Sequence, residues 1–401
     1  MHTNTYLSGI LWIVFASCSL VRGADPPPFR AHLIDDDFAG GYQISAADVN
    51  MDGRPDVIGL STSPARLVWY ENPTWRKHVL TSETRANIDV APYDIDGDGR
   101  PDVVLASAFS LGNSTAGGLL HWLRNPATPT EEWPLDSIGA EPTSHRIRWA
   151  DIDGNGRKEL VNVPIIGPGA KAPLYAVGAR LQWYRIPTNP ANDPWEPQVI
   201  DTTLHMVHGV EVVDWDGDGR EDLLTASFEG INLWQYQPKN DGSWLRTSLG
   251  TGKTAARPNR GSSEVALGRF EPGGSRFIAA IEPWHGNEVV VYTPAGQSDA
   301  VLWRRQVIDS TLVDGHALKV WDFNGDGRDE IVAGFRRKPY NVYLYYRVGT
   351  AAHAWLRTTI DAGGMGAAGF FLADLDGDGD MDLLANGSVT GNIKWYENLT
   401  E

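Results

Sequence analysis

Six copies of one acidic loop constrain this chain more than any other feature. They begin at Asp48, Asp94, Asp151, Asp214, Asp322 and Asp374, and the second copy reads DIDGDGRPD. Each copy has oxygen-bearing side chains at loop positions 1, 3, 5 and 9 and glycine at position 6, a spacing that wraps a short loop around a hard cation such as Ca²⁺. The repeat therefore predicts a repetitive architecture and up to six structural calcium sites.

The predicted calcium ligands are the side chains at those four positions. In chain order they are Asp48, Asn50, Asp52, Asp56, Asp94, Asp96, Asp98, Asp102, Asp151, Asp153, Asn155, Glu159, Asp214, Asp216, Asp218, Asp222, Asp322, Asn324, Asp326, Glu330, Asp374, Asp376, Asp378 and Asp382. An EF-hand would also need Glu at position 12, where none of the six copies has an acidic residue. The loops are therefore not EF-hands.

The spacing of the loops predicts seven repeats. A double-length gap separates the loops at Asp214 and Asp322, and the segment 265–281 fills it with a unit that has Gly268 in place of the first Asp. Around each loop run four short β-rich segments in the same order, at a period of about 50 to 60 residues, which is typical of a propeller blade. We therefore predict an all-β, seven-bladed β-propeller with four-stranded blades over residues 24–401, in which the fifth blade binds no ion.

The last blade is one strand short at the C-terminus. The chain ends soon after the aromatic strand NIKWYEN, whereas residues 29–36 (FRAHLIDD) resemble an unaccompanied fourth strand. We expect the N-terminal strand to complete blade seven, because this closes the ring and removes an open sheet edge.

The N-terminus is typical of a secretory signal. An apolar run from Leu7 to Val21 is too short to span a bilayer and precedes a small-residue cleavage pattern ending at Gly23. Residues 1–23 are therefore predicted to be removed, which places the protein outside the cytoplasm, secreted or periplasmic. Cys18 lies in an imperfect lipobox, but direct export is favoured over lipoprotein anchoring, and no membrane span is expected in the rest of the chain.

The acidity of the chain argues against nucleic acid as a partner. The net charge is −17, and it becomes −18 when Arg22 leaves with the signal. Six bound dications would add twelve positive charges and leave a net charge of about −6. The acidity is thus mostly a requirement of the metal loops, and nothing in the sequence indicates an oligomeric state.

The D-x-D-x-D-G-x-x-D loops between β-strands resemble FG-GAP/VCBS repeats, the calcium-binding blades also found in integrin-type propellers. The resemblance covers essentially the whole mature chain. It implies a calcium-stabilised propeller, but it implies no single function.

Three histidines occupy one register relative to the loops. His145, His208 and His316 each stand six residues before the first loop Asp. In a propeller the innermost strand of a blade runs from one face to the other, so these residues are predicted to meet near the central axis, on the face opposite the metal loops. The sequence EPWHGNE of blade five opens on the same face and adds His285.

Further polar and aromatic residues are predicted on this face. The candidates for substrate binding are Glu229, Glu282, Trp284, Arg336 and Lys338. Several basic residues, among them Arg257 and Arg260, are predicted on the same face of an otherwise acidic chain.

The His-bearing strands, with IEPWHGNEVVVY and DGHALKVWDFNGDGRDEIVAGFR, are similar to the propeller domain of the aldos-2-ulose dehydratase/isomerase family, lyases that act on keto-sugars. The resemblance covers only the propeller and not that family's cupin domains, so it implies dehydration or a related elimination rather than isomerisation. It implies that His145, His208, His285 and His316 are acid/base or substrate-binding groups for a carbohydrate. Such histidines can remove a proton beside a carbonyl and protonate a leaving oxygen.

Two alternatives stay open at this point. Three of the imidazoles could bind zinc or another transition ion that polarises the substrate, which would leave His285 for proton transfer. The chain could instead be a secreted, non-catalytic module that binds a glycan or a protein.

Overall fold

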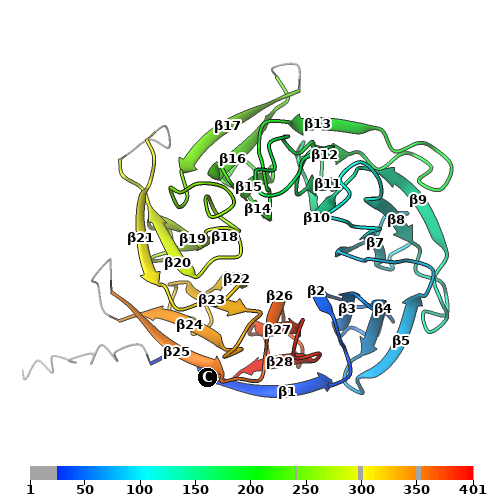
Figure 1. Ribbon diagram of the computed structural model, residues 1–401. Coiled ribbons are helices and arrows are strands. Elements are labelled where there is room, and N and C mark those ends of the chain that lie inside the picture. Colours follow the sequence, from blue (N-terminus) through cyan, green and yellow to red (C-terminus); the bar gives the residue numbers. More distant parts are fainter. Residues whose placement is uncertain (1–24, 240–241, 297–300, 349–353, 401) are drawn as a thin grey trace, which may run out of the picture.

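The computed structural model describes residues 25–239, 242–296, 301–348 and 354–400. The predicted signal, with Cys18, lies outside the described residues. The described chain forms 28 strands in seven four-stranded antiparallel sheets arranged around one axis (Figure 1). The predicted seven-bladed all-β propeller is therefore confirmed. The described residues contain no α-helix, so no helix there could cross a membrane.

Each blade runs outward from the axis, and the first six blades follow chain order. Blade one contains β2 (Gly41–Ala47), β3 (Asp56–Thr62), β4 (Ala65–Glu71) and β5 (Arg76–Thr81), and blade two contains β6 (Asp89–Tyr93), β7 (Asp102–Ser107), β8 (Leu119–Leu123) and β9 (Leu135–Ala140). Blade three contains β10 (Ser144–Ala150), β11 (Glu159–Pro164), β12 (Leu181–Tyr184) and β13 (Pro197–Asp201), and blade four contains β14 (Gly209–Val213), β15 (Asp222–Ser227), β16 (Gly230–Gln237) and β17 (Ser243–Gly250). Blade five contains β18 (Glu264–Arg269), β19 (Arg276–Glu282), β20 (Glu288–Thr293) and β21 (Arg304–Asp309), and blade six contains β22 (Gly315–Trp321), β23 (Glu330–Phe335), β24 (Val342–Arg347) and β25 (Trp355–Asp361).

Blade seven combines both ends of the chain. It contains β26 (Ala367–Ala373), β27 (Asp382–Gly387) and β28 (Ile393–Asn398), with β1 (Phe29–Asp35) as its outer strand. Phe29 pairs with Asn398 and Ala31 pairs with Tyr396 in an antiparallel register. The predicted closure is confirmed, and it leaves blade seven with the same four strands as the other blades.

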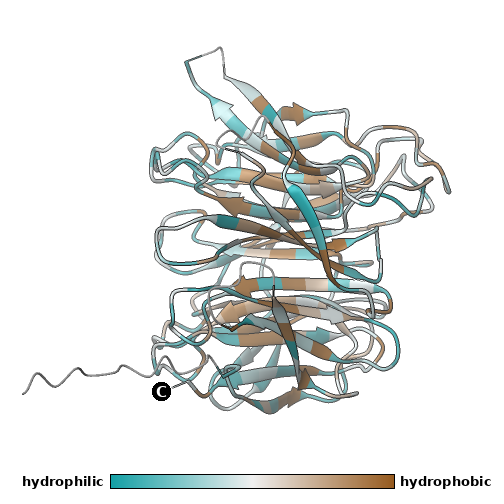
Figure 2. Cartoon of the chain, turned by 90° about the vertical axis from the view of Figure 1, so that its left-hand side faces the viewer, coloured by the Kyte–Doolittle hydropathy of each residue, from teal (hydrophilic) through white to brown (hydrophobic). Residues whose placement is uncertain are grey.

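Seven apolar clusters, one between each pair of neighbouring blades, form the core. β-Branched and aromatic residues favour strands because their side chains pack well on a pleated surface. The second strands, such as DVVLAS in β7, are buried along all or nearly all of their length, because each is covered on both faces by the adjacent blades. Seen edge on, hydrophobic residues follow the strands and hydrophilic residues gather largely in the loops (Figure 2).

Blade five departs from the others as predicted. Its two inner strands are joined by a short turn in which the Phe270 amide donates to the Ser275 carbonyl over 2.9 Å. A Cβ on Gly268 would lie 2.3 Å from Cζ of Phe277, whose ring fills that space. The blade keeps its four strands without an acidic loop.

Candidate functional site

The inner strands bring the three histidines of common register to the central axis. His145 lies in β10, His316 lies in β22, and His208 directly precedes β14. The ring centroids of His145 and His208 are 4.7 Å apart, and those of His208 and His316 are 4.8 Å apart. The predicted convergence is therefore present, and the three side chains start at the face opposite the acidic loops.

The turn between β19 and β20 adds the fourth histidine. The ring centroid of His285 is 4.9 Å from that of His208 and 5.1 Å from that of His316. Its Nε2 lies 3.1 Å from Nε2 of His208. Together, His145, His208, His285 and His316 form what we call the histidine cluster.

Partners outside the cluster fix which nitrogen of two imidazoles faces inward. Nδ1 of His316 lies 2.6 Å from the Ala368 carbonyl oxygen, an acceptor, so this nitrogen carries the proton. Nδ1 of His208 lies 2.8 Å from Oε1 of Glu264. In both histidines Nε2 is then unprotonated and carries a lone pair. Nε2 of His316 is buried without a partner among the described residues.

Glu264 is a functional residue that the sequence analysis missed. Besides holding His208, its Oε1 accepts from Nη2 of Arg146 over 3.2 Å. The Arg146 side chain is 2% exposed and also donates from Nη1 to Nε2 of His145 over 3.3 Å. Neither residue belongs to a motif, so only the folded chain could connect them with the histidines.

Tyr42 was also missed, although the register could have found it. It stands six residues before Asp48, in the position that histidine occupies in three other blades. Its hydroxyl lies 2.8 Å from Nε2 of His145, and its ring centroid lies 5.1 Å from that of His316. Burial raises the pKa of Tyr42, so this phenol stays protonated and can donate a hydrogen bond.

Burial keeps the histidine cluster uncharged. Desolvation, followed by the positive charge of Arg146, lowers the pKa of His145 well below its usual range. Desolvation has the same effect on the pKa of each of the other three, which nearby positive charges lower further. Neutral imidazoles can accept a proton or bind a metal ion, since both need a free lone pair.

A cavity of about 310 Å³ opens onto the cluster. Tyr42, His145, His208 and His285 line one part of it. Apolar residues from the loops of several blades form another part of its wall: Ile88, Phe109, Leu111, Ile165 and Trp284. A mostly apolar cavity with a few converging polar groups is the usual form of a small-molecule site. We call this cavity the funnel.

Trp284, which was predicted to bind substrate, lines the funnel. Its ring centroid is 6.0 Å from that of Tyr175 and 6.5 Å from that of Phe228, in edge-to-face arrangements. Since these aromatic contacts hold the indole at the cavity wall, it offers a fixed apolar surface to a ligand.

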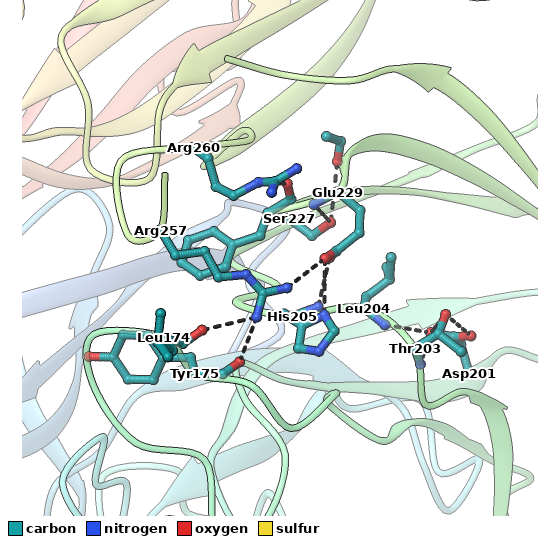
Figure 3. A network of polar contacts seen from close by, with 12 residues as sticks. Leu174, Tyr175, Asp201, Thr203, Leu204, His205, Ser227, Glu229, Arg257 and Arg260 are labelled. Carbon is teal, nitrogen blue, oxygen red and sulfur yellow. Dashed lines mark hydrogen bonds and ion pairs between the residues drawn. The ribbon is translucent and has the colours of Figure 1, made fainter. Parts of the chain in front are cut away.

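Glu229 does not line the funnel, which corrects its prediction as a substrate-binding residue. Its carboxylate accepts from the backbone amide of His205 over 2.8 Å and from Nη2 of Arg257 over 3.2 Å (Figure 3). Arg257 also donates to the carbonyl oxygens of Leu174 and Tyr175, over 3.0 and 3.3 Å. Glu229 therefore joins the β15–β16 turn to the loop before β14 and to the β17–β18 connection, and none of these three segments carries the apolar residues of the funnel wall.

Glu282 is likewise a structural residue rather than a substrate ligand. It is 0% exposed and accepts hydrogen bonds from Ser262 over 2.8 Å, from Tyr292 over 2.5 Å and from Nε of Arg305 over 2.8 Å. These contacts use up its oxygens and fix the start of the turn that carries His285. Only the surroundings of the side chain, which are not visible in the sequence, separate this role from the predicted one.

Replacing Glu282 by glutamine should destabilise the fold. The amide keeps the shape but loses charge-assisted hydrogen bonds from a buried site, so we expect the free energy of unfolding to fall by about 2 kcal/mol in urea denaturation. Asp136→Asn is the matched control, because Asp136 pairs with Arg124 where both side chains are 39% exposed. The control should change stability by less than about 0.5 kcal/mol, and equal effects of the two variants would contradict the role given to Glu282.

The two predicted basic residues differ in their relation to the funnel. Arg336 lines it, and its Nη2 contacts Nδ1 of His285 over 3.0 Å and Oδ1 of Asp314 over 2.9 Å. Lys338 lies outside the funnel, in an adjoining groove that also contains Arg336.

Three outer histidines are held by other side chains away from the funnel. His32 stacks on Trp395, His78 stacks on Trp69, and His121 lies 2.9 Å from the Ser107 hydroxyl. His353 lies outside the described residues.

The acidic loops share one internal geometry, which blade two shows well. The Asp94 carboxylate accepts from the amides of Gly97 and Gly99 over 2.8 and 2.9 Å. The last carboxylate, Asp102, accepts from the amide of Ile95 over 3.2 Å. These bonds turn the loop so that side-chain oxygens converge on one point.

Carboxylate groups gather in four of the loops, with ligand atoms within 4.8 Å of one another. They are Asp94, Asp96 and Asp102; Asp151, Asp153 and Glu159; Asp214, Asp216 and Asp218; and Asp374, Asp376 and Asp382. Burial raises the pKa of the last carboxyl group in several loops, for example to about 7 for Asp222 and Asp382. A donor set of crowded, half-buried carboxylates fits a dication, which would favour the ionised form.

Comparison with known proteins agrees with this geometry. The fold defines a seven-bladed β-propeller. Residues 48–105 and 322–385 match the sequence model of the FG-GAP-like repeat. Residues 117–295 match the model described as "Aldos-2-ulose dehydratase, beta-propeller domain".

A related protein is aldos-2-ulose dehydratase of Phanerodontia chrysosporium, which is 31% identical over 235 residues. The match covers 54% of this chain and 25% of that protein, so the chain spans about a quarter of its relative.

Two solved structures share the fold. The Dos1 propeller has a TM-score of 0.55 at 8% identity and covers 90% of this chain and 78% of its own. BBS1N, in its complex with ARL6DN, has a TM-score of 0.54 at 12% identity, with 90% and 94% covered. At these identities the likeness concerns the fold alone.

Proposed function

We propose that this propeller is a carbohydrate dehydratase that carries out β-elimination on a keto-sugar in the funnel. The observation that carries the proposal is the convergence of four neutral histidines and Tyr42 beside an apolar cavity. The similarity to the propeller of aldos-2-ulose dehydratase supports a carbohydrate as the substrate.

The reaction needs a base next to an acid. A base removes the proton on the carbon beside the carbonyl, the C–O bond at the next carbon breaks, and the leaving oxygen takes a proton and departs as water or an alcohol. A neutral imidazole such as His145 can accept the first proton. Once Nε2 of His145 has taken up the proton, it can donate to the Tyr42 hydroxyl oxygen 2.8 Å away. The Tyr42 proton is then free to be donated to a substrate oxygen, and Arg336 can offset negative charge that develops on the enolate.

The same cluster can hold a transition ion, which we propose as its cofactor. His208, His285 and His316 have ligand atoms within 4.8 Å of one another. Two of the three have Nδ1 held by an acceptor outside the cluster, an arrangement that is usual for metal-binding histidines. An ion held there would polarise a carbonyl oxygen.

Binding of the ion can be tested without measuring enzyme activity. Purified protein should contain about one equivalent of zinc or a similar metal by elemental analysis, and cobalt substitution should give the visible absorption of a histidine-ligated site. His316→Ala should lose this metal, whereas His32→Gln, on the outer strand of blade seven, should keep it. Equal metal content in the two variants would remove the ion from the proposal.

The acidic loops are proposed to bind calcium and stabilise the ring, and the protein is proposed to act after export. Up to six ions are expected, one for each complete loop, and none in blade five.

The decisive experiment is a search for the unsaturated product. Purified protein is incubated with 1,5-anhydrofructose and with 3-keto-glycosides, and the ultraviolet absorbance of an enone is followed. We expect absorbance to appear with at least one of these ketones and not with the matching non-keto sugar, which lacks the activated C–H bond. If a folded, metal-replete protein gives no product from any of them, it is a binding module rather than an enzyme.

A further inference from the structure

A second space adjoins the funnel between blades six and seven. This groove has a volume of about 530 Å³, and its walls come from Asp314, the turn 336–340, and Ser388 with Val389. Arg336 and Ser388 line both the groove and the funnel. A ligand that fills the funnel can therefore extend into the groove.

The groove carries an excess of positive charge. Three consecutive cationic residues, Arg336, Arg337 and Lys338, face a single carboxylate, Asp314. Asp314 pairs with Arg336 over 2.9 Å and with Arg337 over 3.3 Å. Lys338 is exposed and has no ion-pair partner in the part of the chain that the structure describes. About two positive charges thus remain, in a chain whose net charge is −17.

Backbone hydrogen bonds hold this basic turn in place. The amide of Arg336 donates to the Asp314 carbonyl over 3.1 Å, and the amide of Tyr340 donates to the Arg337 carbonyl over 3.0 Å. The Tyr340 carbonyl in turn accepts from the amide of Met365 over 3.2 Å. The charges are therefore presented by a fixed backbone, which lowers the ordering cost of binding an anion.

We propose that the groove binds an anionic group on the unit next to the reacting sugar, such as a uronate carboxylate or a sugar sulfate. The inference rests on the proposed function and names the substrate class of the same site. The mostly apolar funnel accepts the reacting keto-sugar ring, and the adjoining unit places its anion over Arg337 and Lys338. Charge complementarity of this kind supplies specificity and faster association.

Binding of unreactive ligands tests the groove. Calorimetry compares a glucose-terminated disaccharide with its glucuronate-terminated and sulfated counterparts at low and high salt. We expect either acidic ligand to bind about tenfold more tightly than the neutral one at low salt, because it gains two exposed charge pairs that are each weak. This preference should shrink as salt rises.

Two variants locate the effect. The double variant R337Q/K338Q should lose the preference for the acidic ligand while its affinity for the neutral ligand stays unchanged. K239Q is the control, because Lys239 is an exposed cation after β16, at the face of the acidic loops, and it should keep the full preference. The proposal is overturned if the wild type binds no acidic ligand more tightly than the neutral one, or if R337Q/K338Q keeps the preference.

The outcomes also separate this inference from the proposed function. An acidic preference without enone formation from any ketone leaves the groove in place and removes the dehydratase. Enone formation without a preference for the acidic ligand supports the dehydratase and removes the anion-binding groove.

Discussion

Replacing His145 by alanine should reduce enone formation from a keto-sugar by at least about 100-fold, the usual contribution of a positioned general base. His145 is expected to have a large effect because its imidazole is neutral and lies at the wall of the funnel, beside the Tyr42 hydroxyl. Steady-state kinetics should show the loss mainly in kcat, since the apolar wall that holds the sugar is unchanged.

Companion variants separate chemistry from metal binding. Tyr42→Phe should keep the metal and lose about tenfold or more in kcat, because only a hydroxyl is removed. His316→Ala should lose both metal and activity. His32→Gln should behave as the wild type, since His32 stacks on Trp395 in the outer part of blade seven. Wild-type turnover by folded His145→Ala would show that His145 is not the base.

Removing calcium should lower the melting temperature by about 10 °C. An ion that binds only the folded state contributes about 2.7 kcal/mol at a free concentration one hundred times its Kd. Several such sites together give on the order of 10 kcal/mol, and each kcal/mol shifts the melting temperature of a large domain by about 1 to 2 °C. Calorimetry of chelator-treated protein, with and without added CaCl₂, measures the shift.

Single substitutions show whether the acidic loops are responsible. Asp96→Ala removes a ligand at position 3 of the blade-two loop and should lower the calcium content by one ion per chain. Glu271→Gln is the control, because Glu271 is an exposed acidic residue in the blade-five turn, which lacks the loop. A melting temperature that does not respond to calcium would contradict occupied sites.

The sequence predicted the fold well because the repeat is local. Each acidic loop and the strands beside it form one continuous segment, so the order of strands, the ring of seven blades and the closure by residues 29–36 follow from pattern alone. The gap between Asp214 and Asp322 was sufficient to reveal blade five.

The site was predicted only in part. A distance of six residues along one strand placed His145, His208 and His316 at the axis, and the same count could have included Tyr42. Glu264 could not be found this way, because it acts on His208 from the next blade.

The acidic candidates show the limit of sequence reasoning most clearly. Glu229 lies in the β15–β16 turn and Glu282 is the last residue of β19. Their carboxylates are engaged by a loop amide, hydroxyls and arginines. A residue's position along a strand gives the face of the propeller on which it lies. It does not give the partners that its oxygens find there.

The sequence by itself determined the ring, its seven repeats, the acidic loops and the face on which the histidines meet, because all of these depend on periodic spacing within short segments. The tertiary structure alone decided which imidazole nitrogens are free, which carboxylates are structural, and that a basic groove joins the funnel. These features depend on contacts between different blades, such as Glu264 with His208 and the Ala368 carbonyl with His316. Such contacts exist only after the ring has closed.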